Sequence, residues 1–265
     1  HAHDPPAVER RGDGEQHDDH PCSAYPVRAR VNGVPSQRAR CRKPMSAIDR
    51  SRVVTPDDAD WPAGFAELRD PPAFVTVRGV LPRGGIAVVG AREADPELAA
   101  FARELAARLR RPIVAGLAPG IDDAAHRGAL DGGSPTVAYV GGGLAKLEDR
   151  VLAAAIVAGG GAVASEYASD DEPTRWSRIA RDRLQAAHAE AVVLIVSDLY
   201  GGAMHTLRFA RELGRPTFAL AIRATGNAAA LAAGAAPLPL DPAPAVEQIA
   251  ARLATEVRRS GSRRS

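Results

Sequence analysis

Short apolar runs alternate with Ala-, Leu- and Arg-rich stretches along the chain from about Trp61 onward. The runs are apolar at every position, which is typical of strands that are buried on both faces of a parallel sheet. The stretches between them repeat their apolar residues at helical spacing. The predicted strands are 73–79, 86–89, 113–115, 136–140, 162–164, 191–196 and 217–220, and the predicted helices are 96–110, 122–130, 147–158, 174–189, 203–213 and 245–257.

This alternation predicts an α/β fold, an extended Rossmann-like doubly wound sheet that is mostly parallel and forms a single domain. Residues 1–55 are polar, rich in Pro and Arg and without periodicity, so we expect a disordered N-terminal segment. The Rossmann-like domain is expected at 56–241, followed by a C-terminal helix and basic tail at 242–265. The first methionine is Met45, and we hypothesise that residues 1–44 are upstream sequence outside the native protein.

Net charge and cysteine content limit the classes of protein to which this chain can belong. The net charge of the 265 residues is only +2, so a nucleic-acid site would have to be a local cluster of arginines. Cys22 and Cys41 both precede the predicted domain, which indicates a reduced compartment and excludes a disulfide scaffold. No apolar run reaches the length of a membrane span and no signal peptide is visible. We therefore expect a cytoplasmic protein without membrane contact, cofactor or metal.

The loops that follow the predicted strands carry glycines that suit a phosphate ligand. Ligands of open α/β sheets bind at the carboxyl ends of the strands, where helix N-termini offer free N–H groups to an anion. The first core strand is followed by Gly90 and Arg92, the second by Gly116 and Gly120, and a later one by Gly201. Each loop alone is equally compatible with a plain strand-to-helix turn, but together they predict a phosphate-binding rim.

One predicted helix adds a row of arginines to this rim. Arg175, Arg178 and Arg181 are three residues apart and share a helix face, which suits a phosphate track or a solvated charged face equally well. No catalytic or metal-binding residue is predicted. The predicted phosphate- or DNA-binding residues are Gly90, Arg92, Gly116, Gly120, Arg178, Arg181, Arg183, Gly201, Gly202 and Thr206.

Three further polar residues near the loops have structural rather than catalytic interpretations. Asp122 is interpreted as a structural N-cap of the helix that follows it. His126, within that helix, is interpreted as a packed core histidine. Glu166 stands at a strand end, where an acid could contact a ribose or a base, and a structural hydrogen-bonding role fits the same position.

Together these segments resemble the DprA/Smf family of DNA-processing proteins. The resemblance implies a Rossmann domain that binds single-stranded DNA without being an enzyme, forms a homodimer and helps load a RecA-type recombinase in natural transformation. In that family a cationic pocket at the sheet edge holds the DNA backbone. The motifs that carry the resemblance are AVVGAR at 87–92, AGLAPGID at 115–122, AHRGAL at 125–130, SEY at 165–167 and the stretch 181–219, within a likeness that runs from Trp61 to Asp241.

Two alternative functions remain open. A nucleotide phosphoribohydrolase of the LOG type carries a PGGxGTxxE motif, which residues 201–206 echo in part, although Phe209 stands where an acid is needed. A nucleotide-sensing domain without turnover fits the same loops. Within the resemblance, Pro119 stands where a basic residue is common and Asp182 replaces an asparagine, so the ligand could be DNA or a mononucleotide.

Overall fold

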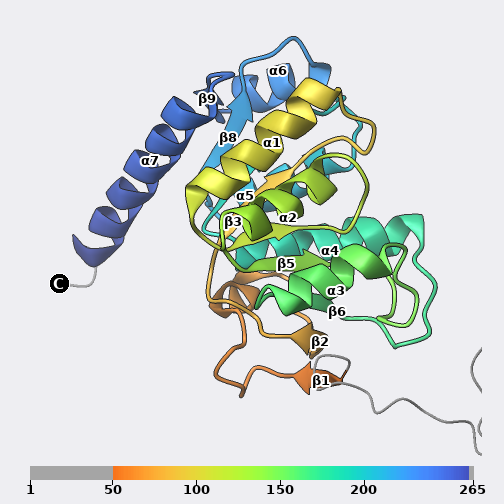
Figure 1. Ribbon diagram of the computed structural model, residues 1–265. Coiled ribbons are helices and arrows are strands. Elements are labelled where there is room, and N and C mark those ends of the chain that lie inside the picture. The colour runs from red at the N-terminus through yellow and green to blue at the C-terminus, as the bar shows by residue number, and fades with distance from the viewer. Residues whose placement is uncertain (1–49, 263–265) are drawn as a thin grey trace, which may run out of the picture. The chain divides into compact units, whose positions relative to one another are not determined.

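The computed structural model describes residues 50–262, which contain a nine-stranded sheet (Figure 1). The sheet order is β1-β2-β6-β5-β4-β3-β7-β8-β9. All neighbouring strands from β6 to β9 in this order pair in parallel, whereas β2 pairs antiparallel with β6 and β1 antiparallel with β2. The strands are β1 (Ser51–Val54), β2 (Val75–Gly79), β3 (Ile86–Val89), β4 (Ile113–Ala115), β5 (Thr136–Tyr139), β6 (Ala162–Ser165), β7 (Ala191–Leu194), β8 (Thr217–Leu220) and β9 (Ala236–Leu238).

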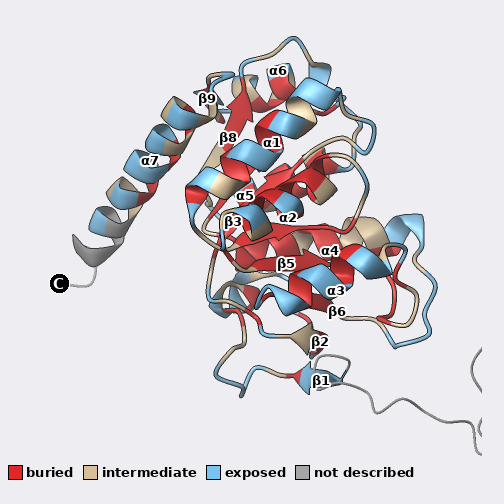
Figure 2. Ribbon diagram, viewed as in Figure 1, coloured by how far each residue is buried: buried red, intermediate tan, exposed pale blue. Residues whose placement is uncertain are grey.

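Helices cover both faces of the sheet, as its continuously apolar strands require. Side chains alternate between the faces, so Ile86 and Val88 pack in one cluster with α1, α2 and α7 while Ala87 and Val89 pack in another with α4, α5 and α6. Figure 2 shows the buried strands between the helical layers. The helices are α1 (Pro96–Leu109), α2 (Ile121–Asp131), α3 (Arg150–Ala158), α4 (Arg175–His188), α5 (Ala203–Glu212), α6 (Thr225–Ala232) and α7 (Pro242–Ser262), with a short 3-10 helix η2 (Ala63–Glu67).

The fold class and most predicted elements are confirmed. Strands 86–89, 113–115 and 217–220 have their predicted bounds, whereas β7 ends at Leu194 and α7 continues to Ser262, past its predicted end at 257. The prediction of disorder up to residue 55 is wrong at its end, because Ser51–Val54 form β1 and pair with β2. The predictions for Met45, Cys22 and Cys41 lie outside the described residues.

Two elements near the C-terminal end were not predicted. Half of the residues of helix α6 are alanine, with no apolar spacing that marks a helix, and β9 is three residues long with a central proline. Proline is tolerated in β9 because this strand lies at the edge of the sheet, where one side needs no ladder hydrogen bonds. Both elements depend on contacts with β8, and α6 also on contacts with α5, that local pattern does not encode.

Candidate phosphate-binding pocket at the carboxyl edge of the sheet

A pocket of about 590 Å³ lies at the carboxyl edge of the sheet, where the loops after β3 and β7 face the first turns of α4 and α5. Strand β3 has β4 on one side and β7 on the other, so the strand order reverses here. This reversal is the switch point at which open α/β sheets bind their ligands. We call this cavity the switch-point pocket. Of the predicted site residues, it is lined by Gly90, Arg92, Arg178, Arg181, Gly201, Gly202 and Thr206.

The arginines of this pocket differ in burial and in partners. Arg92 is exposed, and it forms no ion pair with any residue of the described range 50–262. Arg178 is half-buried and forms an ion pair with Glu148. Arg181, one turn further along α4, is 9% exposed and lies at the floor of the pocket. The arginines predicted to share one face of α4 therefore become more buried along the helix, from Arg178 to Arg181 at the pocket floor.

Two buried carboxyl groups flank Arg181, and sequence reasoning missed this arrangement. The Asp182 Oδ1 atom lies 3.0 Å from Arg181 Nη1, and the Gln185 amide donates a hydrogen bond of 3.3 Å to the same oxygen. The pKa of Asp182 is raised to about 7, chiefly by burial and also by the nearby Asp122, against the attraction of Arg181. Burial likewise raises the pKa of Asp122, against the attraction of Arg181. The floor thus holds one permanent positive charge and two carboxyl groups whose pKa values are raised above the ordinary value.

Gly116 and Gly120 do not line the pocket but allow its walls to approach each other. A Cβ atom at Gly116 would lie 2.3 Å from Arg181 Nη2 and 2.5 Å from Asp122 Oδ2, so only glycine leaves room for both side chains. Gly120 has a φ of +83° and its Cβ would lie 2.3 Å from the Arg92 carbonyl oxygen. Both glycines therefore act from behind the pocket, by shaping the loops that bear Arg92 and Arg181.

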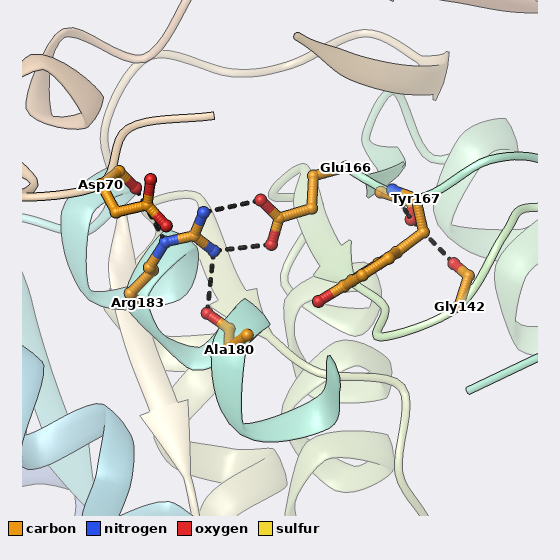
Figure 3. A network of polar contacts seen from close by, with 7 residues as sticks. Asp70, Gly142, Glu166, Tyr167, Ala180 and Arg183 are labelled. Carbon is orange, nitrogen blue, oxygen red and sulfur yellow. Dashed lines mark hydrogen bonds and ion pairs between the residues drawn. The ribbon is translucent and has the colours of Figure 1, made fainter. Parts of the chain in front are cut away.

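Arg183 is not brought to the pocket, which corrects its predicted place beside Arg181. Figure 3 shows its guanidinium in a bidentate ion pair with Glu166, with both N–O distances at 2.6 Å. Its Nε atom also donates to the Asp70 carbonyl oxygen at 3.0 Å. Two residues along an α-helix turn the side chain by about 200°, so Arg183 points away from the face of Arg181. The structural interpretation of Glu166 fits this pair.

The other two polar predictions have opposite outcomes. His126 is fully buried, its Nε2 lies 2.6 Å from the Gly116 carbonyl oxygen and its Nδ1 lies 2.7 Å from the Thr136 hydroxyl, which confirms a packed core histidine. Burial lowers its pKa to about 4, so the ring is neutral at pH 7. Asp122 is not the N-cap, because Gly120 occupies that position. Its carboxylate instead accepts backbone N–H groups of Gly116 and Ala118 at the pocket floor.

Aromatic side chains and a second hollow adjoin the pocket. Tyr200 lines the pocket and is 93% exposed, and the exposed Trp176 ring lies under the Arg175 guanidinium at 5.8 Å. The neighbouring hollow shares Arg92, Arg178 and Arg181 with the switch-point pocket and extends to Gly141–Gly143 and Lys146 after β5.

Among the described residues, no cluster of potential metal ligands was found. No helix within 50–262 is both long and apolar enough to cross a membrane.

A doubly wound sheet with an arginine-lined pocket at its switch point defines this molecule as a Rossmann-like protein suited to a phosphate-bearing ligand. The family model for DNA recombination-mediator protein A matches residues 52–250. The chain therefore belongs to this family, which confirms the resemblance to DprA/Smf proteins.

Individual relatives agree with this assignment. A putative DNA processing protein DprA of Mycobacterium tuberculosis is 35% identical over 201 residues, which are 68% of this chain and 51% of that relative. This chain thus spans about half the length of that curated relative. The X-ray structure of DprA from Streptococcus pneumoniae has a TM-score of 0.64 and 27% identity over 72% of each chain. A DprA structure from Helicobacter pylori, described for its mode of binding single-stranded DNA, has a TM-score of 0.67 and 24% identity over 81% of this chain and 99% of that one.

Proposed function

We propose that the chain binds single-stranded DNA in the switch-point pocket without chemically altering it. The observation that carries the proposal is that two arginines line one pocket. Arg92 is exposed and forms no ion pair within the described residues, and Arg181 is buried at the floor. Guanidinium groups bind phosphate in a bidentate manner. Tyr200 and Trp176 offer exposed rings on which bases can stack, which single-strand binders use without sequence preference.

The relatives extend this proposal to a role in recombination. A Helicobacter pylori relative of the same fold is described as binding single-stranded DNA, and the family is described as a mediator of recombination. We therefore propose that the DNA-bound chain, as a homodimer in the cytoplasm, helps to load a RecA-type recombinase during natural transformation. A test of loading is to measure whether the chain accelerates strand-exchange by such a recombinase on DNA coated with single-strand-binding protein.

The DNA site is tested by Arg92→Ala in a fluorescence anisotropy titration with labelled oligothymidine. Loss of one phosphate contact is expected to weaken binding about 10-fold at low salt and to make the salt dependence shallower by about 0.7 in log–log slope. Arg108→Gln is the matched control, because it removes one exposed arginine at the C-terminal end of α1 that does not line the pocket. Equal affinity of wild type and the Arg92 variant would exclude this site.

A nucleotide phosphoribohydrolase is the second candidate, and one observation favours it. Asp182 faces the pocket with a pKa of about 7, a value suited to proton transfer at neutral pH. Incubation with AMP and detection of free adenine separates the two functions. Release of adenine that is lost in Asp182→Asn would establish the hydrolase, and no release at high protein concentration would dismiss it.

A further inference from the structure

A second pocket, of about 380 Å³, lies on the flank of α3 next to β2. Two arginines and a set of aliphatic side chains line it, and none of the predicted site residues belongs to it. We call it the α3 pocket. Its lining residues are Arg78, Leu144, Ala145, Leu147, Arg150, Ala154 and Val157.

The fold explains why two guanidinium groups meet here. Arg78 lies on β2 opposite Val163 of β6, and Val163 packs under α3, so the Arg78 side chain is on the α3 face of the sheet. Arg150, Ala154 and Val157 are spaced four and three residues apart and share one face of α3. The two arginines thus approach the pocket from different layers, one from the sheet and one from the helix.

These arginines lack the carboxylate partners that many others in the chain have. Among the described residues neither Arg78 nor Arg150 forms an ion pair, and the Nε atom of Arg78 is buried without a hydrogen-bond partner. Arg150 donates one hydrogen bond, of 3.0 Å, to the Ala145 carbonyl oxygen. The neighbouring Asp149 carboxylate accepts the Leu152 N–H as the N-cap of α3. A buried donor without a partner is costly, so an anionic ligand would be favoured here.

The α3 pocket lies next to the hollow that adjoins the switch-point pocket. The loop from Gly141 to Asp149 separates it from the hollow beside the switch-point pocket, and Leu147 lines both cavities. Lys146 lies on the hollow's side of this loop and Arg150 at its end. Cationic side chains therefore follow one another from Arg181 across the loop to Arg78.

We propose that the α3 pocket is a second subsite for the same DNA strand, in which Arg78 and Arg150 hold a phosphodiester and the aliphatic wall packs against the adjoining sugar. This inference rests on the proposed function. It predicts that a strand must be long enough to cross the loop before these two arginines contribute to its affinity. The absence of aromatic rings from this lining fits a subsite for the backbone rather than for stacked bases.

The experiment compares two oligothymidines, of about 6 and about 20 nucleotides, in anisotropy titrations with the full chain. Arg78→Gln/Arg150→Gln is expected to weaken binding of the long strand about 10-fold and to make its log–log salt slope shallower by about 1.4, for two lost phosphate contacts. Binding of the short strand should not change. Arg108→Gln/Arg252→Gln is the charge-matched control, because it removes two arginines from exposed pairs on α1 and α7.

The outcomes separate this inference from the function on which it rests. Unchanged binding of the long strand by the double glutamine variant overturns the subsite. An equal loss of affinity for the short and the long strand also overturns the subsite, provided that thermal melts show that the double glutamine variant and its control are folded. If the double glutamine variant does not fold, Arg78→Lys/Arg150→Lys keeps the charge and should retain long-strand binding. Absence of binding to either strand by wild type contradicts the proposed function itself.

Discussion

At the residue scale, the carboxyl group of Asp182 competes with any phosphate for the Arg181 guanidinium. The two side chains are in contact at 3.0 Å, and both are almost fully buried. Because burial raises the Asp182 pKa to about 7, this carboxyl group is largely neutral below that pH and charged above it. Protonation of Asp182 removes one negative charge from the pocket floor. Anion binding should therefore be coupled to proton uptake.

We predict that DNA affinity falls with rising pH across the Asp182 titration. Between about pH 6 and pH 8 the wild type should lose about 10-fold in affinity, while Asp182→Asn should bind tightly throughout and show a shallower dependence. The measurement is anisotropy at constant ionic strength. His205, which also lines the pocket, has a pKa that burial and Arg208 lower, so its titration is centred at a lower pH. An identical pH profile for wild type and the asparagine variant would contradict the coupling.

The same shift makes a separate prediction about stability. The folded-state pKa of Asp182 is raised from 3.8 to about 7, so its protonated form is favoured by folding and the stabilisation is lost as pH rises through this window. Asp182→Asn should therefore have about the same free energy of unfolding as wild type near pH 4 and exceed it by a few kcal/mol above pH 7. Urea denaturation at the two pH values measures this difference. A constant difference across the range would mean that Asp182 keeps an ordinary pKa.

At the element scale, the ion pair between Arg183 and Glu166 joins α4 to the loop after β6, while Arg183 Nε reaches the segment before β2. We predict that Arg183→Met lowers the free energy of unfolding by about 3 kcal/mol, because it leaves a largely buried carboxylate without its partner. DNA affinity measured under conditions where the variant is folded should not change. Arg183→Met/Glu166→Leu should recover part of the lost stability. A loss of DNA affinity without a loss of stability would restore Arg183 to the binding site.

Element-scale reasoning also shows where the sequence was sufficient. Strands such as Ile86–Val89 are apolar at every position and bounded by glycines, so their local pattern determines them. The same reasoning correctly grouped the loops after β3 and β7, since parallel strands bring their carboxyl ends to one edge. Arg183 and Arg181 are two residues apart and therefore lie on different faces of α4. This helical periodicity could have been used to leave Arg183 out of the predicted site. The electrostatic interaction between Asp122 of α2 and Asp182 of α4 links residues 60 positions apart, and no local pattern in the sequence encodes it.

At the scale of the whole molecule, the main error of sequence reasoning concerns where the folded domain begins. Ser51–Val54 is short and follows a polar stretch, so composition alone places it outside the domain. Its strand conformation depends on pairing with β2, which extends the sheet beyond β6 in the antiparallel direction. Val54 is fully buried in the core that also contains Val75 and Phe65. This strand is therefore part of the domain's hydrophobic core.

A comparison of two shortened chains tests this boundary. A chain that begins at Pro56, the start predicted from sequence, should be less stable than one that begins at Met45 by about 2 kcal/mol, from the lost burial of Val54. For a domain of this size the loss corresponds to a Tm lower by about 6 °C. Both chains should bind the short oligothymidine equally, because β1 lies at the end of the sheet while the switch-point pocket lies between β4 and β7. Val54→Ala in the longer chain should show part of the same decrease. Equal Tm values for the two chains would mean that β1 contributes no stability and that the domain begins where composition places it.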